Sequence, residues 1–258
     1  MMNYISKFFN LSFMGLLQYF LLTGLYYGIC YFLFKKALYN AKIQQKEMKR
    51  QDIIREILHS TGSSCIMVLM IFMVVESPLR NYTKIYENIN DYSLYWLAGS
   101  IIIGLCIHDT YFYWMHRLLH HKKIFRYVHL IHHKSTNPSP FAAYSFHLLE
   151  AAAEGLIVPI LLFLIPLHHI SIVIFILSSL FINGYGHLGY EIAPKWLRNS
   201  FLFKIFNTSV HHNLHHHKFK GNYGLYFRFW DQVMKTEHPD YLKTYDSIQK
   251  KRFGEVGE

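Results

Sequence analysis

The chain has 258 residues, of which 52% are hydrophobic and only 16% charged, and its formal net charge is +10. This length favours one domain, and the composition favours an integral membrane protein over a soluble one. The basic residues lie in blocks between apolar segments. A basic cytoplasmic face against anionic lipid therefore explains the charge better than a nucleic-acid partner, and we expect no nucleic-acid partner.

The N-terminal part alternates between apolar and basic segments. Residues 12–34 carry no charge and are long enough to cross a bilayer. Residues 35–58 contain seven Lys or Arg and predict a helix along the membrane surface, with an ordinary solvated helix as the alternative. Two further apolar segments follow at residues 60–78 and 93–115, separated by the nearly neutral loop 79–92.

The C-terminal part holds two more apolar runs, residues 148–165 and 170–186, joined by a short linker that predicts a helical hairpin. Both runs are near the lower length limit for a span, which leaves a re-entrant or tilted pair open. The remaining residues to Glu258 contain eleven Lys or Arg and no further span.

The distribution of Lys and Arg orients the chain, because basic loops stay in the cytoplasm. This places residues 35–58, the loop at 116–135 and the C-terminal segment inside, and loop 79–92 outside. The expected fold class is all-α, an integral membrane helical bundle of about four transmembrane helices with a cytoplasmic helical cap. The membrane would be the bacterial inner membrane, or the endoplasmic reticulum in a eukaryote.

The cap is rich in histidine, with seven of the eighteen histidines between His108 and His133. Residues three and four apart share a helix face, so each cluster should aim its imidazoles at one point. Imidazole is a common metal ligand. Eight such donors are too many for one tetrahedral zinc and suit two metal ions. Three boxes supply them: His116 and His120; His129, His132 and His133; His212, His215 and His216.

These histidines also have simpler interpretations than a specific metal site. A lone histidine is more often a structural hydrogen-bonding residue, and a histidine run can bind metal adventitiously. Two HxxHH boxes and one HxxxH box, each beside an apolar segment, are hard to obtain by chance. The pattern therefore favours a purpose-built metal site.

Three segments, HDTYFYWMHRLLHH, HLIHH and HHNLHHHKFKGNYGLYFRFWD, resemble the fatty acid hydroxylase / sterol desaturase superfamily of membrane enzymes. The resemblance covers residues 95–240. It implies a non-haem centre of two Fe ions on the cytoplasmic side, with O₂ as co-substrate, that hydroxylates or desaturates a C–H bond of a fatty acyl or sterol-like lipid. It also implies that the eight box histidines are catalytic metal ligands and that His187 is a further ligand.

The resemblance suggests a division of the chain. Residues 1–92 would hold N-terminal transmembrane helices and the basic surface helix, 93–240 the catalytic region, and 241–258 a basic C-terminal tail. The segment Asn222–Gly224 matches the family's NYG and is expected to form a turn that packs the last box.

Three further residues are expected to support the metal ligands. Asp109 could orient a metal-bound imidazole, since such rings usually need a partner on their second nitrogen, or could be a helix-end charge. His147 forms an i, i+3 pair with Glu150 at the start of an apolar run, where ionisable groups are costly and suggest function. Glu191, four residues after His187, could ligate a metal, accept from a ligand's ring N–H, or be a surface charge.

The chemistry agrees with a redox metal, because no side chain can cleave an unactivated alkyl C–H bond. Imidazole alone does not select iron. The lipid substrate would enter from the bilayer, and electrons would come from a separate carrier protein on the cytoplasmic face. The alternative is a membrane zinc protein without redox chemistry, either a hydrolase or a metal transporter. A zinc hydrolase needs only three protein ligands, and a transporter should place its ligands near mid-membrane.

Overall fold

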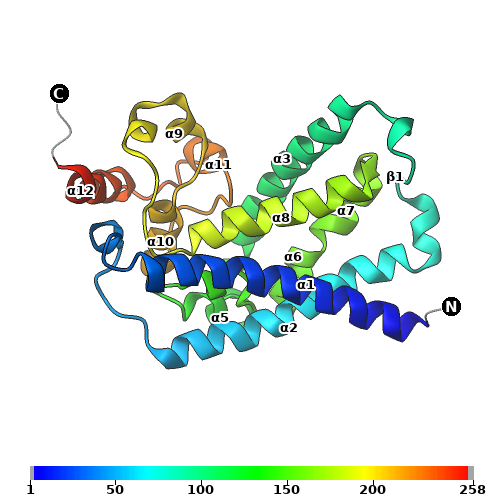
Figure 1. The fold of residues 1–258 in the computed structure, drawn as a ribbon, viewed down its shortest axis with the longest axis horizontal. Helices are drawn as coiled ribbons and strands as arrows, with labels where there is room; N and C mark the ends of the chain where they lie inside the picture. Colours follow the sequence, from blue (N-terminus) through cyan, green and yellow to red (C-terminus); the bar gives the residue numbers. More distant parts are fainter. Residues whose placement is uncertain (1–2, 255–258) are drawn as a thin grey trace.

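Four long helices run lengthwise through the molecule in the computed structural model, which describes residues 3–254 (Figure 1). They are α1 (Tyr4–Tyr27), α2 (Arg50–Val75), α3 (Leu94–Leu119) and α8 (His169–Gly186). Ser93 caps the N-terminus of α3, accepting a hydrogen bond from the Trp96 N–H at 3.2 Å. The chain is thus mostly helical, as predicted.

Shorter elements connect the long helices and form the cap around the histidines. They are η1 (Gly28–Leu33), η2 (Tyr39–Ala41), η3 (Pro78–Tyr82), β1 (Ile85–Tyr86), η4 (Ile89–Asp91), α4 (Phe125–Val128), α5 (Leu130–His133), η5 (Pro140–Tyr144), α6 (Leu148–Gly155), α7 (Ile157–Leu164), β2 (Leu167–His168), η6 (Lys195–Asn199), α9 (Phe201–Ile205), α10 (Ser209–Lys218), α11 (Phe229–Val233) and α12 (Tyr241–Phe253).

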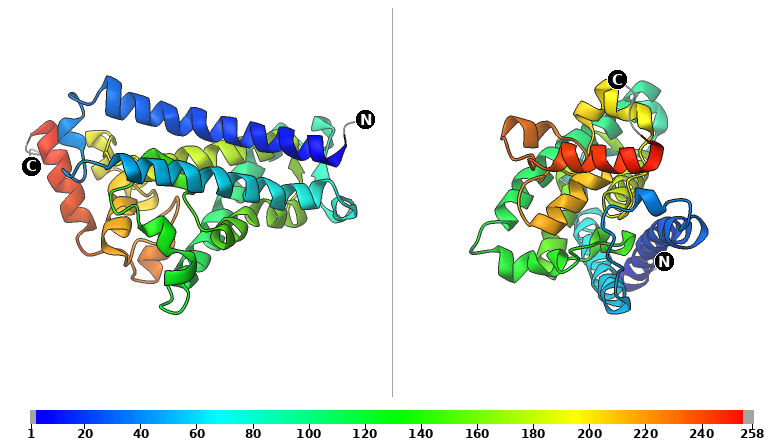
Figure 2. Two further views of the ribbon diagram at one scale, coloured as in Figure 1. Left: turned by 90° about the horizontal axis from the view of Figure 1, so that it is seen from below. Right: turned by 90° about the vertical axis from the view of Figure 1, so that its left-hand side faces the viewer.

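Within residues 3–254, three helical segments are long and apolar enough to cross a membrane: Tyr4–Leu33, Arg50–Val75 and His169–Gly186. Helix α3 is as long as α2 but is not among these candidate spans, and it carries His108, Asp109 and Arg117 in its second half. Figure 2 shows α1 and α2 running side by side along the bundle.

The long helices bury small polar residues and expose large apolar ones. In α2 the buried residues include Ser60, Ser63 and Ser64, whereas Leu58 and Met73 are exposed. Small side chains let helix backbones approach closely, and an apolar outer surface suits lipid. The expectation of an integral membrane helical bundle is confirmed in this respect.

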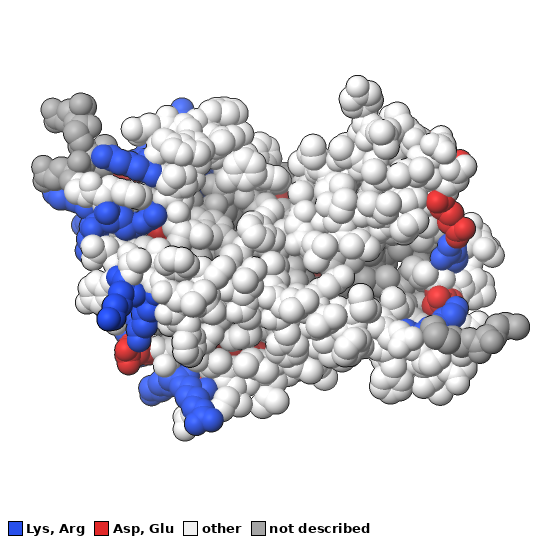
Figure 3. Space-filling view, viewed as in Figure 1, with Lys and Arg blue, Asp and Glu red and all other residues white. Residues whose placement is uncertain are grey.

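The two ends of the bundle differ in charge. At one end, β1 pairs in parallel with β2, which brings loop 79–92 beside the turn between α7 and α8. Figure 3 shows Lys and Arg gathered at the opposite end, near α10 and α12, with an almost uncharged band between. This is the asymmetry on which the predicted orientation was based.

The predicted basic helix over residues 35–58 is wrong in its first half. Residues 35–49 form turns and η2, and helix α2 begins only at Arg50. The reason is a tertiary contact: the Ile43 N–H donates to the Gly189 carbonyl at 3.0 Å, and the Glu191 N–H donates to the Ala41 carbonyl at 2.8 Å. This backbone pairing competes with helix formation.

Two other segments differ in detail from expectation. Residues 148–165 form two eight-residue helices, α6 and α7, which meet at Leu156, so this half of the predicted hairpin is not one continuous helix. The predicted C-terminal tail contains α12, whose Tyr241, Tyr245 and Ile248 are buried in a core with Val210 and Leu214 of α10. Helix α12 therefore supports the helix that carries the last histidine box.

Candidate metal centre

Nine buried or nearly buried histidines form two compact groups at the basic end of the bundle. Within each group one ligand atom per residue lies within 4.8 Å of all the others. Group one contains His116, His120, His129, His133 and His215. Group two contains His132, His187, His212 and His216. The nine residues are the same ones that were expected from the sequence to bind metal.

The sequence suggested that each box aims its imidazoles at one point, but the structure divides two of the boxes between the groups. His129 and His133 belong to group one, but His132 between them belongs to group two. Likewise His212 and His216 belong to group two, whereas His215 faces group one. Residues four apart share a helix face and adjacent residues do not, so each HxxHH box divides between the groups.

The two groups are immediate neighbours. The ring centroids of His133 in group one and His216 in group two lie 5.0 Å apart. Helices α5 and α10 contribute to both groups, and α3 contributes only to group one. Two adjacent cation sites built on shared helices suit a pair of metal ions that act together.

Backbone carbonyls orient two rings of group one. The His116 Nδ1 lies 2.9 Å from the Tyr223 carbonyl oxygen, and the His215 Nδ1 lies 2.6 Å from the Gly221 carbonyl oxygen. Both carbonyls belong to the loop after α10, where Asn222 adopts a left-handed φ of 54°. The NYG segment therefore does more than pack the box, because its backbone selects the ring tautomer.

Group two is oriented in the same way. The His187 Nδ1 lies 2.9 Å from the Asn183 carbonyl oxygen, and the His216 Nδ1 lies 3.0 Å from the Ser135 carbonyl oxygen. A carbonyl only accepts, so each Nδ1 carries the proton and each Nε2 presents a lone pair. The two Nε2 atoms face each other at 3.1 Å. Two lone pairs at this distance repel unless a cation lies between them, so these residues fit a metal ion.

The spacing of the donors also fits a shared metal ion. The His212 Nε2 lies 3.0 Å from the His187 Nε2 and 3.1 Å from the His216 Nε2. Nitrogen ligands of one ion, at metal–nitrogen bonds of about 2.1 Å, lie about 3.0–3.4 Å apart. These three residues would therefore be able to hold the same ion.

Burial keeps these imidazoles neutral. It lowers the pKa of His133 to about 3 and that of His187 to about 4. Burial, and then repulsion between neighbouring rings, holds the pKa of His212, His215 and His216 well below the usual value. The rings are therefore in the form that binds metal at neutral pH.

Glu150 contacts a candidate ligand directly. Its Oε1 lies 2.6 Å from the His129 Nδ1, and the two side chains are 1% and 2% exposed. A carboxylate on the second nitrogen is the usual support for a metal-bound imidazole. The sequence analysis singled out His147 of this pair, but His147 is the N-cap of α6 and accepts from the Leu149 N–H. The acid, not the histidine, touches a candidate metal ligand.

Asp109 and Glu191 are buried and contact backbone N–H groups instead of a ring. Asp109 Oδ1 accepts from Leu225, Tyr226 and Phe227 at 2.7–3.2 Å, which ties α3 to the loop after the last box. Glu191 accepts from the Tyr185 hydroxyl, the Ala193 N–H and the Val210 N–H at 2.7–3.1 Å. Its negative charge also lies at the N-terminus of α10, where the helix dipole favours it.

Asp231 was missed by the sequence analysis. Its carboxylate is buried and accepts from the Tyr223 N–H at 2.9 Å, the Gly224 N–H at 2.8 Å and the Thr236 hydroxyl at 2.7 Å. It holds the loop whose carbonyls orient His116 and His215. The available signal was an acidic residue at the end of an otherwise aromatic segment, which is weak evidence without the fold.

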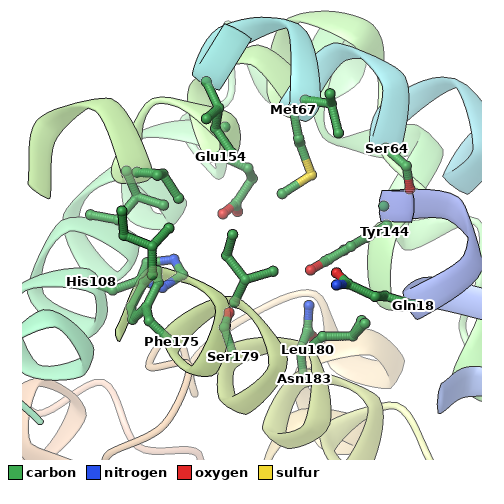
Figure 4. Close-up of a pocket in the computed structure, with 18 of the residues that line it drawn as sticks. Gln18, Ser64, Met67, His108, Tyr144, Glu154, Phe175, Ser179, Leu180 and Asn183 are labelled. Atoms are coloured by element: carbon green, nitrogen blue, oxygen red, sulfur yellow. The ribbon is translucent and has the colours of Figure 1, made fainter. Parts of the chain in front are cut away.

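A cavity of about 280 Å³ lies beside the two groups, between α1, α2, α3, α6 and α8 (Figure 4). Its lining is mainly apolar. Two lining residues also touch the histidines: the Phe112 ring centroid lies 4.9 Å from that of His116, and the Phe146 ring lies 5.1 Å from that of His132. The arrangement joins an apolar binding space to a candidate two-metal centre, in a chain with helices long and apolar enough to span a membrane.

Comparison with known proteins identifies a family with these features. The fatty acid hydroxylase family model matches residues 101–236, which contain all nine histidines. The chain therefore belongs to the fatty acid hydroxylase family, a family of membrane di-iron hydroxylases and desaturases that act on lipids, and the resemblance seen in the sequence is confirmed.

Two relatives illustrate the similarity. A Delta(7)-sterol 5(6)-desaturase from Gibberella zeae is 32% identical over 78% of this chain and 59% of its own length. A lathosterol oxidase from Mus musculus is 29% identical over 88% of this chain and 77% of its own length. No solved structure matches the chain. The chain spans less than two thirds of the length of the fungal relative. The activity, substrate and partners of this chain are therefore proposals.

Proposed function

We propose that this chain is a membrane-bound di-iron enzyme that uses O₂ to desaturate a sterol-like lipid. The observation that carries the proposal is the convergence of nine histidine ligand atoms in two adjacent groups beside an apolar cavity. The names of the relatives, a sterol desaturase and a lathosterol oxidase, support the substrate class and the outcome.

The overall reaction fixes what the chain must bind. Desaturation converts a CH–CH unit, O₂, two electrons and two protons into a C=C unit and two molecules of water. Iron, when bound, would supply the one-electron steps that O₂ reduction and C–H cleavage require. The chain's own residues would hold the metals through imidazole, keep bulk water out of the apolar cavity, and position the lipid.

The donor set supports iron over zinc. A catalytic zinc site takes three protein ligands and an open position, whereas the groups here offer five and four imidazoles. A metal transporter should place its ligands near mid-membrane, whereas these lie at the basic end of the bundle. The non-redox alternatives are therefore disfavoured.

The lipid would reach the cavity from the bilayer. Leu11 and Met14 of α1 and Val173 of α8 line the cavity, and these residues are 44%, 50% and 45% exposed. In this proposal the lipid enters between α1 and α8, past these side chains. Lateral access suits a substrate that is nearly insoluble in water.

We infer a cytoplasmic position for the metal groups and a separate electron carrier on that side. Lys218, Lys243 and Lys251 line a groove against α10, together with Asn213 and Leu214. By helical geometry these α10 residues face away from His212, His215 and His216. A carrier bound there would approach the metals through one helix. In this proposal residues 93–240 form the catalytic region, and 1–92 and 241–258 support it.

The direct test is reaction of the purified protein in lipid nanodiscs with lathosterol, a chemical reductant and ¹⁸O₂. A product with one more C=C bond and no ¹⁸O label supports desaturation. A hydroxylated product carrying ¹⁸O would retain the oxidase but overturn desaturation. Lathosterol left unchanged by an iron-loaded sample would contradict the proposal.

A further inference from the structure

Two buried side chains in the wall of the apolar cavity have polar atoms without a partner. Glu154 is 6% exposed, and among the described residues its carboxyl makes no hydrogen bond or ion pair. His108 is 4% exposed, and its Nδ1 contacts the Tyr226 hydroxyl at 2.8 Å while its Nε2 is unpaired. Neither residue belongs to the two histidine groups.

Such groups are costly unless a ligand satisfies them. A buried polar group without a hydrogen bond is unfavourable, because it has lost its hydrogen bonds to water and gained none in return. The remaining lining is mostly aliphatic and aromatic, so folding alone gives no reason for a carboxyl here. Figure 4 shows the Glu154 carboxyl directed into the cavity, with His108 in the adjacent wall beside Phe175. The location points to a polar atom of the bound molecule.

The donor and acceptor properties define that atom. An isolated carboxyl in apolar surroundings is favoured in its neutral form, which both donates and accepts. The Nε2 of His108 supplies a second donor or acceptor, depending on its tautomer. An alcohol oxygen also donates and accepts, so it matches the hydrogen bonding of either group. A carboxylate or phosphate headgroup would bring a second acid and a full charge into an apolar cavity that holds no Lys or Arg in its lining.

We propose that Glu154 and His108 form a polar subsite for the single hydroxyl group of an otherwise apolar lipid. This rests on the proposed function, because the lipid is taken to be the substrate. Glu154 lies one helical turn after Glu150, about 6 Å along α6, and Glu150 contacts His129 of group one. The hydroxyl end would therefore be anchored near the metals, and Glu154 would determine specificity for lipid alcohols over hydrocarbons and fatty acids.

Binding of matched probes to the full chain in nanodiscs tests the subsite. The probes are lathosterol and its 3-deoxy analogue, and octadecanol and octadecane, each measured by displacement of a fluorescent sterol. We expect the wild-type protein to prefer at least one alcohol over its hydrocarbon by about tenfold or more, as for one hydrogen bond to a buried group. The Glu154→Leu variant should reduce that preference below about threefold while still binding the hydrocarbon.

Two further variants serve as controls for Glu154→Leu. Ser64 lines the same cavity, but its hydroxyl already donates to the Ser60 carbonyl at 2.8 Å, so Ser64→Ala should keep the wild-type preference. Glu154→Gln, which retains a donor and an acceptor, should keep most of it. If Glu154→Leu does not fold, the wild-type comparison of each alcohol with its hydrocarbon still tests the subsite, because equal binding of the two would overturn it.

Two outcomes would overturn the subsite: a wild-type protein that binds alcohol and hydrocarbon equally, or a Glu154→Leu variant with the wild-type preference. Iron content and O₂-dependent turnover of the wild-type sample are measured in parallel. If the sample lacks iron or O₂-dependent turnover, the proposed function is contradicted even where the alcohol preference holds. If iron and turnover are present but the preference is absent, only the subsite is overturned.

Discussion

The contact between Glu150 and His129 gives a sharp prediction for metal affinity. The Glu150 Oε1 lies 2.6 Å from the His129 Nδ1, and both side chains are almost fully buried. The change Glu150→Gln keeps the size and one acceptor oxygen but removes the negative charge. Glu150→Ala removes the contact and leaves the ring N–H without a partner.

The size of the effect follows from the kind of contact. A hydrogen bond to a charged group contributes about 1.5–3 kcal/mol, and loss of the partner of a metal-bound histidine typically costs about 10–100-fold in affinity or activity. We expect Glu150→Gln to weaken metal binding by about tenfold and Glu150→Ala by up to about 100-fold. The loss is smaller in Glu150→Gln because its amide oxygen still accepts a hydrogen bond from the His129 ring.

The assay is metal release from purified protein against a calibrated chelator, followed by metal analysis. His147→Ala is the matched control, because His147 lies three residues away and caps α6 without touching a candidate ligand. It should reduce stability by about 1 kcal/mol and leave metal affinity unchanged. Wild-type affinity in both Glu150 variants would refute the role assigned to the carboxylate.

Three further predictions concern the metal groups and the orientation of the chain. His187→Ala should abolish turnover and lower metal content, whereas Glu191→Gln should keep the metals and lower the thermal midpoint, because Glu191 supports α10 and contacts no histidine ring; equal metal loss in both variants would contradict this. Chelation should lower the melting temperature, since bound metal stabilises the native state; an unchanged melting curve would argue against bound metal. In a cysteine-free background, Asn81→Cys and Lys220→Cys should react with a membrane-impermeant maleimide from opposite sides; labelling from one side would overturn the orientation.

The histidine positions were predictable because the boxes are local. Spacing of three and four residues places side chains on one helix face before any tertiary contact forms. The division into two groups was not predictable in the same way. His215 turns toward the end of α3, while His212 and His216 of the same helix turn toward His187, and that choice depends on how α10 is packed.

The supporting contacts were harder to predict than the candidate ligands. Carbonyls of Ser135, Asn183 and Tyr223 orient three rings, and every residue carries a carbonyl, so no residue type marks them. The prediction of a helix over residues 35–49 was wrong for a related reason. Its composition predicts a helix, but its backbone pairs with residues 189–191, far away in the sequence.

The proposed chemistry requires two iron ions per chain. The measurement is iron and zinc content of the purified protein from iron-replete cells, made on the same sample as a single-turnover reaction with lathosterol and O₂. We predict two iron ions per chain and oxidised lipid product in proportion to the iron. One zinc ion per chain that does not respond to iron supply, with no O₂-dependent product from iron-loaded protein, would contradict the account.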